Sequence, residues 1–298
     1  MEVLSSYIVP QGSESKRLGD FTHIVLDTIS TKSAAKKAIK KGEILVDGVV
    51  VEPSRFVRQG QVIEHIEISF ELKRIFELPL KIVFEDEHLA VIFKPAGYSV
   101  SGNYFRTIEN AIPFNFKKSN TFDALNIPKP VHRLDNQTSG LLIIAKTNSA
   151  LLEFGRQFEK KLIKKKYQAV VIGEPEMLGS INLPIDGKEA VTTFEVVKTV
   201  HSIKYNTLSL VNLFPQTGRT HQLRIHLAKI GHPILGDKLY TPEELLFKGK
   251  GLFLSAVDLQ FEHPILKKQT KLEIPTPNKF NALLNREEAR WEKYQALK

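Results

Sequence analysis

The chain has 298 residues, of which 42% are hydrophobic and 25% charged, a composition typical of a folded globular protein that excludes disordered and collagen-like chains. It contains no cysteine, which excludes disulfides, thiolate nucleophiles, iron–sulfur clusters and cysteine-ligated zinc. The 42 Lys and Arg residues outnumber the 33 Asp and Glu residues, and the resulting net charge of +9 favours a polyanionic partner.

No segment predicts secretion or membrane insertion. Met1–Leu18 lacks a basic start followed by an apolar stretch. The longest strongly apolar runs, such as Leu141–Ala145, are far too short to cross a bilayer. We therefore expect a cytoplasmic protein without a membrane partner.

The length predicts about two domains, and changes of pattern along the chain indicate where they divide. Residues 1–14 show no periodicity and are expected to be a flexible leader. We expect a small α/β domain over 15–70 and a charged linker over 71–80. A larger α+β domain that ends in a helix is expected over 81–298.

A basic helix is predicted in the small domain over Thr31–Lys41. Ala35, Ala38 and Ile39 lie on one side of this helix, and no acidic residue interrupts the segment. The ammonium groups on the other side repel one another and would be neutralised by the phosphates of a nucleic acid. A solvated surface is the other interpretation. The lysines concerned are Lys32, Lys36 and Lys40.

A small hairpin is predicted after this helix. Gly42 is a candidate helix cap, and Asp47-Gly48 between short apolar runs favours a tight turn. This order of elements, over about Lys16–Glu67, resembles the alpha-L RNA-binding domain of a ribosomal small-subunit protein, which is also attached to several RNA-modifying enzymes. The resemblance implies that the three lysines bind RNA. The chain departs from the usual Ser-Arg, Asn-Gly and Gly-Asp of that family at Lys32-Ser33, Asp47-Gly48 and Gly60-Gln61.

Short apolar runs separated by turns dominate the larger domain. They favour strands with many antiparallel neighbours. Helices are predicted over 148–161, 218–229 and 278–298. Together these elements predict an α+β fold.

The most informative segment is His132–Lys146, in which polar and charged residues precede Gly140 and an apolar strand. Such groups lie at the mouth of a sheet. Asp135 would stay ionised there beside Arg133 and hydroxyl donors, ready to act as a nucleophile or a base. The other interpretation is that Asp135 only caps a turn and pairs with Arg133.

Signatures of cofactor and metal sites are missing from the sequence. The chain has no glycine motif for dinucleotides or phosphates, no His-Glu-x-x-His and no Gly-x-Ser-x-Gly. His221 and His226 lie five residues apart without a third ligand at a typical spacing. We expect neither a cofactor nor a metal.

The segment His132–Lys146 resembles the catalytic motif of the RluA-type pseudouridine synthases, which isomerise uridine in RNA. The resemblance spans about Ile82–Ile274 and implies a mainly antiparallel mixed sheet with a central active-site cleft. Four other segments resemble further motifs of this family in the expected order: Lys94–Gly97, Lys165–Ala169, Thr217–His226 and Gly231–Asp237.

Two departures from the family concern the choice of target. Tyr98–Asn103 lacks a His that the family often carries there. Asn136 stands where an Arg often follows the catalytic Asp.

By this resemblance Asp135 is the essential carboxylate, which either attacks the sugar or removes the C2′ proton. Tyr167 resembles the tyrosine that stacks on the target base and helps to remove the C5 proton; a ring that only packs against the sheet is the alternative. Arg219 resembles the basic partner of the carboxylate, and an RNA phosphate is its alternative ligand.

RNA contacts are expected around these residues. The resemblance makes Arg133 the best candidate for contacting the RNA where the target nucleotide is flipped out. A second basic stretch, Lys160–Lys166, precedes Tyr167 and could deliver phosphates to the cleft. The residues of the larger domain expected to bind RNA are His132, Arg133, Lys94, Lys165 and Arg224.

The sequence therefore predicts a cofactor-independent RNA pseudouridine synthase with a small N-terminal α/β RNA-binding domain. The expected target is structured ribosomal RNA, most of all that of the large subunit, and transfer RNA is the alternative. No DNA partner is expected, and a monomer is the default. Two other classes stay open: a non-catalytic RNA-binding or ribosome-assembly factor on the same scaffold, and a sugar hydrolase, which the lack of a second carboxylate in the motif disfavours.

Overall fold

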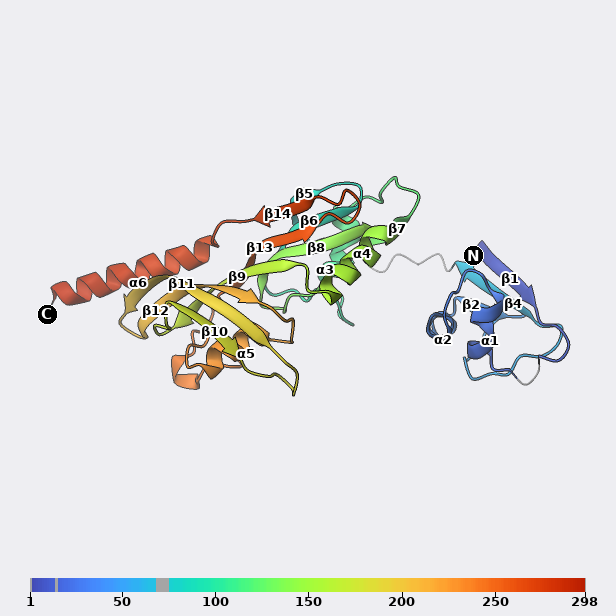
Figure 1. The fold of residues 1–298 in the computed structure, drawn as a ribbon, viewed down its shortest axis with the longest axis horizontal. Helices are drawn as coiled ribbons and strands as arrows, with labels where there is room; N and C mark the ends of the chain where they lie inside the picture. Colours follow the sequence, from blue (N-terminus) through green and yellow to red (C-terminus); the bar gives the residue numbers. More distant parts are fainter. Residues whose placement is uncertain (1, 14–15, 68–74, 298) are drawn as a thin grey trace. The chain divides into compact units, whose positions relative to one another are not determined.

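The computed structural model describes residues 2–13, 16–67 and 75–297 and shows two compact units (Figure 1). Unit 1 is Met1–Lys73 and unit 2 is Arg74–Lys298. The boundary between them falls inside the segment 71–80.

Unit 1 is a four-stranded antiparallel sheet with two helices. Its elements are β1 (Glu2–Ile8), α1 (Leu18–Val25), α2 (Lys32–Lys40), β2 (Ile44–Val46), β3 (Val49–Val50) and β4 (Val62–Glu67). The strands lie in the order β1-β4-β2-β3. Leu18 of α1, Ile39 of α2 and Ile63 of β4 are fully buried and meet in one apolar core.

The predicted basic helix and hairpin are both present. The side chain of Thr31 accepts a hydrogen bond from the backbone N–H of Ala34 and caps α2. Asp47 and Gly48 have φ of 53° and 75°, as a type I′ turn requires at both of its central residues.

The expected flexible leader is wrong for the residues that the structure describes. Glu2–Ile8 form β1, which pairs antiparallel with β4 along the edge of the sheet, and the next residue, Val9, is buried in the core. Backbone hydrogen bonds hold an edge strand, and the exposed side chains of Val3, Leu4 and Ile8 break the alternation that a pattern search needs.

Unit 2 is built on a ten-stranded sheet. Its strands are β5 (Lys81–Glu85), β6 (Leu89–Lys94), β7 (Ala124–Pro130), β8 (Ser139–Thr147), β9 (Lys164–Ile172), β10 (Leu178–Asn182), β11 (Val191–Ser202), β12 (Asn206–Pro215), β13 (Leu254–Glu262) and β14 (Gln269–Glu273). Eight strands follow the order β10-β11-β12-β9-β13-β8-β6-β5, while β14 pairs with β13 and β7 with β8. Among the strand pairs of the described residues, only β13 and β8 are parallel, so the mainly antiparallel mixed sheet and the α+β class are confirmed.

Helices flank this sheet (Figure 1). They are α3 (Ile108–Asn115), α4 (Asn148–Glu159), α5 (Gln222–Lys229), the 3-10 helix η1 (Glu243–Leu245) and α6 (Asn278–Ala296). α4 contacts β8, α5 contacts β12 and α6 contacts β11. The three predicted helices are confirmed, but α5 begins later than expected because His221 has a left-handed backbone and ends the preceding turn.

Part of the expected linker belongs to unit 2. Phe76, Leu78 and Leu80 pack against a buried cluster that includes Ile108 of α3 and Ile144 of β8. The linker expectation is therefore wrong for these residues, because charged neighbours in the sequence conceal three apolar side chains that alternate along an extended segment. Residues 71–74 lie outside the described residues.

β8 is buried at every position, and Gly140 near its start allows the parallel contact with β13. Gly140 has φ of 117°, which disfavours any residue with a side chain. A β-carbon there would overlap the backbone of Ala256. The closest approach of two central strands therefore depends on this glycine.

We expect Gly140→Ala to lower the free energy of unfolding by about 3 kcal/mol or more, because both the backbone of Ala256 and the φ angle oppose a methyl group. Chemical denaturation followed by circular dichroism measures this change. Gly155→Ala on α4 is the matched control: no atom lies within 4 Å of its β-carbon, and the helix should gain about 0.5–1 kcal/mol. Equal stability of the two variants would contradict the role of Gly140 in the close approach of β8 and β13.

Candidate active site

The loop between β7 and β8 carries Asp135. The backbone N–H of Thr138 donates to the carbonyl oxygen of Asp135 at 3.1 Å and closes a turn. Leu134 is buried in the cluster under the loop and anchors it. The side chain of Asp135 is 29% exposed and lines a pocket, so it is accessible to a substrate.

Lys94, at the end of β6, holds this loop from below. Its side chain is fully buried, and its ammonium group donates to the carbonyl oxygens of Pro95, Asn136 and Thr138 at 3.0, 3.2 and 2.8 Å. Burial lowers the pKa of Lys94 to about 8, and the Asp135 carboxylate opposes that shift. The expected RNA contact of Lys94 is wrong, because a buried cation bonded to three carbonyl groups cannot reach a phosphate.

Asp135 is oriented by two residues at the start of α5. Arg224 Nη1 lies 3.7 Å from its Oδ2, and His221 Nε2 lies 3.9 Å from its Oδ1. Both distances exceed those of hydrogen bonds, so the oxygens keep lone pairs for a substrate. Neither Arg219 nor Arg133 is an ion-pair partner of Asp135 in the described part of the chain. The predicted pairing with Arg219 and the alternative pairing with Arg133 are therefore both wrong.

Arg224 is fixed by a second carboxylate. Its Nε and Nη2 donate to Asp237 at 2.7 and 2.8 Å, and the Asp237 side chain is fully buried. The backbone N–H groups of Leu239 and Tyr240 also donate to Asp237. Arg224 was expected to bind RNA; instead it is buried and bonded to Asp237, and it carries the positive charge that faces Asp135.

Arg219 lies in the turn before α5. Its backbone N–H donates to Gln222 Oε1 and its Nε donates to the carbonyl oxygen of Glu189. The buried Gln222 also accepts a hydrogen bond from Thr217 and so ties the turn together. Arg219 is partly buried and lines the pocket of Asp135; its alternative ligand, an RNA phosphate, stays a prediction.

Tyr167, on the central strand β9, lines the same pocket as Asp135. Burial and the nearby Asp135 carboxylate both raise the pKa of Tyr167, so its hydroxyl stays protonated. A protonated phenol is a poor base, whereas its ring still offers a stacking surface. The raised pKa of Tyr167 therefore favours a stacking role over proton removal.

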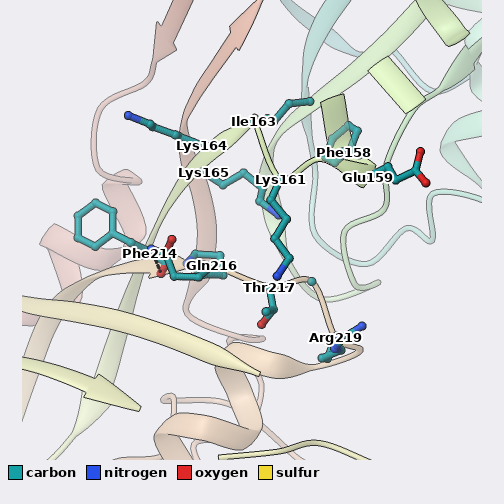
Figure 2. A pocket seen from close by; sticks show the side chains of 12 residues that line it. Phe158, Glu159, Lys161, Ile163, Lys164, Lys165, Phe214, Gln216, Thr217 and Arg219 are labelled. Atoms are coloured by element: carbon teal, nitrogen blue, oxygen red, sulfur yellow. Dashed lines mark hydrogen bonds between the residues drawn. The ribbon is translucent and has the colours of Figure 1, made fainter. Parts of the chain in front are cut away.

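Two cations complete the pocket rim. Arg133 is exposed and lines the pocket near Asp135, and Lys165 lies two residues before Tyr167 on the same face of β9. Burial lowers the pKa of Lys165. Lys165 and Arg219 also line a neighbouring hollow (Figure 2), so the positive charge continues beyond the pocket.

His132 does not face the pocket. Its Nε2 accepts a hydrogen bond from the backbone N–H of Ile143, and its ring packs against Phe158 with the ring centres 5.1 Å apart. Burial, aided by Lys165, lowers the pKa of His132 to about 3. The expected RNA contact of His132 is wrong, since a neutral imidazole that accepts a backbone hydrogen bond serves the fold.

Among the described residues, no cluster of three or more His, Cys, Asp or Glu side chains could hold a metal ion. Buried His226 illustrates this: its ring bonds to Thr192 and to the carbonyl oxygen of Leu183. Among the same residues, no helix is both long and apolar enough to cross a membrane.

The basic helix α2 of unit 1 is partly neutralised. Asp20 of α1 lies 2.9 Å from Lys32 and 4.0 Å from Lys36, and the hydrogen bond from Lys32 lowers the pKa of Asp20. The expectation of an uncompensated lysine cluster is wrong, because the acid comes from another helix. Lys36 and Lys40 line a shallow basic hollow together with Arg17.

Two residues of the site were missed by sequence reasoning. Asp237 was noted only as the end of a motif, and Gln222 was not singled out. The signal that could have identified Asp237 is an acidic residue directly after a glycine in a mostly apolar segment. Nothing in the sequence distinguishes Gln222 from an ordinary helix residue.

Comparisons with known proteins point to two families, one for each part of the chain. A family model described as RNA pseudouridylate synthase matches residues 88–229, and the model of the S4 domain matches residues 29–63. A protein of Aquifex aeolicus named "Uncharacterized RNA pseudouridine synthase" is 35% identical and aligns with 91% of this chain and 93% of its own length. Ribosomal large subunit pseudouridine synthase D of Vibrio cholerae is 32% identical over 85% of this chain and 86% of its own length.

Solved structures share the fold of unit 2. The structure of human RNA Pseudouridylate Synthase Domain Containing 4 superimposes with a TM-score of 0.57 at 25% identity. It covers 69% of this chain and 92% of the human chain. The fold thus has a known counterpart among solved structures.

We expect acid to destabilise the protein through His132. Its pKa is about 3 in the folded chain against an ordinary 6.5, so the unfolded chain binds a proton first as the pH falls below 6.5. Stability should therefore drop between pH 6.5 and 3, by roughly 2–4 kcal/mol from this residue.

His132→Gln tests this expectation, because an amide oxygen can accept the hydrogen bond of Ile143 and does not titrate. The free energy of unfolding of the variant, measured against pH, should fall less steeply in this range. Parallel curves for the variant and the wild type would refute the role of His132.

Proposed function

The chain belongs to the RNA pseudouridine synthases, as an RluA-type member with an N-terminal S4 RNA-binding domain, and on this premise we propose that it isomerises specific uridines of large-subunit ribosomal RNA with Asp135 as the reacting carboxylate. The observation that carries the proposal is the pocket in which Asp135 faces both Tyr167 and the fixed charge of Arg224.

The reaction needs an ionised carboxylate. It breaks the bond between N1 and C1′, turns the uracil and joins C5 to C1′, after which C5 loses a proton and N1 carries one. Asp135 either attacks C1′ or removes the C2′ proton, and only the carboxylate form can do either. The positive charge of Arg224 lies 3.7 Å from this carboxylate.

The other groups of the pocket bind and retain the base. The ring of Tyr167 offers a face on which uracil can stack, and its protonated hydroxyl can donate a hydrogen bond. Exposed Arg133 lines the pocket and can contact the RNA when the target nucleotide leaves its stack, a step that costs a few kcal/mol. Because the uracil is retained, it serves as its own nucleophile and a second carboxylate is not needed.

Ribosomal RNA as the target is supported by two observations. Relatives of Vibrio cholerae and other bacteria are named as synthases of the ribosomal large subunit. The S4 domain adds a basic surface on Lys36 and Lys40, which suits a large folded RNA. Mapping pseudouridines in RNA from cells with and without the protein tests the target; loss confined to transfer RNA would favour the alternative.

We expect Asp135→Asn to lower isomerisation by about 10⁴-fold or more, because the amide can neither attack C1′ nor remove a proton. RNA affinity should change little, since the negatively charged Asp135 does not bind phosphate. Release of tritium from RNA labelled at uridine C5 measures turnover, and a binding titration measures affinity. Retained turnover would refute the role of Asp135, and release of free uracil by the wild type would indicate a hydrolase.

We expect neutralisation of the basic surface of unit 1 to weaken binding in a salt-dependent manner. The double variant Lys36→Gln with Lys40→Gln should lower the slope of log affinity against log salt by about 1–2 and leave kcat unchanged. The control double variant Lys268→Gln with Lys293→Gln removes the same charge elsewhere and should keep the slope. Equal slopes for both double variants would indicate that α2 is only a solvated face.

A further inference from the structure

A second hollow adjoins the catalytic pocket and has no part in the proposed chemistry. It lies between the turn that joins α4 to β9 and the loop that joins β12 to α5, and its volume is about 800 Å³. Lys165, Thr217 and Arg219 line both the hollow and the pocket of Asp135. A ligand can therefore extend from one into the other.

The hollow is basic. Four cations line it, and Glu159 is its single acid. None of the four takes part in an ion pair with a carboxylate of the described residues. Uncompensated cations that converge on a cavity favour an anionic ligand. The four are Lys161, Lys164, Lys165 and Arg219.

The hollow also has an apolar wall. Phe158 and Ile163 line it from the α4–β9 side, and Phe214 lines it from the end of β12. Aromatic rings beside cations are the usual surface for single-stranded nucleic acid, since bases stack on the rings while phosphates meet the cations. A nucleotide fits this combination better than a free inorganic anion.

Lys161 follows the end of α4 beside this hollow and has a strained backbone. Its N–H donates to the carbonyl oxygen of Phe158, and the N–H of Leu162 donates to that of Gln157, which is the Schellman pattern at the end of a helix. Lys161 has φ of 56° at the position where glycine is normally found. Figure 2 shows its side chain running across the hollow toward Thr217.

We propose that this hollow is a subsite for the nucleotide next to the target uridine and that Lys161 binds the phosphodiester of that nucleotide. The inference rests on the proposed function, because it requires the target uridine in the pocket of Asp135. A left-handed lysine is retained at the helix end because the charge contributes to RNA binding, and strained backbone is generally found at such functional positions.

Lys161→Gly separates binding from stability. On a stem–loop RNA that contains the mapped target uridine, KM should rise about threefold to tenfold while kcat stays the same, and the salt slope should fall by about 0.7–0.9. The melting temperature should rise by roughly 2–4 °C, because glycine relieves the left-handed backbone. Lys267→Gly, at the other left-handed lysine (φ 54°), is the control and should leave KM and the salt slope unchanged.

The second measurement places the contact on the RNA. Single phosphodiester linkages on either side of the target uridine are replaced by neutral methylphosphonates. One replacement should raise KM of the wild type as much as Lys161→Gly does, and should raise KM of the variant no further, because both remove the same contact. Additive effects at every linkage, or an unchanged KM of Lys161→Gly, would overturn the subsite.

The two proposals fail in different ways. If Asp135→Asn retains turnover, the proposed chemistry fails whatever Lys161 does. If Asp135→Asn is inactive and Lys161→Gly keeps the wild-type KM and salt slope, the chemistry stands and only the subsite fails.

Discussion

The buried carboxylate of Asp237 is the constraint on which the active site depends. A carboxylate with 1% exposure is stable only beside a cation with good hydrogen bonds, and Arg224 supplies two of them. The fork uses Nε and Nη2, which leaves Nη1 to face Asp135 at 3.7 Å. Asp135 therefore faces a positive charge that another acid holds in position and whose desolvation that acid compensates.

Lys94 is a second buried charge that hydrogen bonds satisfy, in this case to backbone carbonyl groups. Its buried ammonium group has no carboxylate within ion-pair distance among the described residues and is satisfied by the carbonyl oxygen of Pro95 and by two carbonyl oxygens, of Asn136 and Thr138, in the loop that carries Asp135. An apolar replacement would leave these carbonyls without a donor, which is costly in the interior. The loop and the helix that face each other across the pocket are thus each held by a buried charge, and both keep their geometry before RNA binds.

The sequence predicted the α+β fold, the basic helix, the hairpin and the grouping of Asp135 with Tyr167 around one pocket. It did not predict which cations are buried. Arg219 and Arg224 belong to one motif, and both fall inside the helix that was expected from Gly218. That expectation did not distinguish a buried arginine from an exposed one. The helix begins only at Gln222, so Arg219 stays at the rim, while the buried acid that captures Arg224 is distant in sequence. Long-range pairing of charges has no local pattern.

Several described residues other than glycine have a left-handed backbone, which costs stability. Among described residues, three of the non-glycine residues with left-handed φ are of types that tolerate it, namely Asp47, Asp186 and Asn206. The others are His221, Lys161 and Lys267; His221 and Lys161 line the two adjoining cavities, whereas Lys267 lines neither. The turn at His221 directs its ring between Asp135 and the hydroxyl of Tyr240. Glycine would relax the turns at His221 and Lys161 but would supply neither an imidazole nor an ammonium group to the cavities that these side chains line.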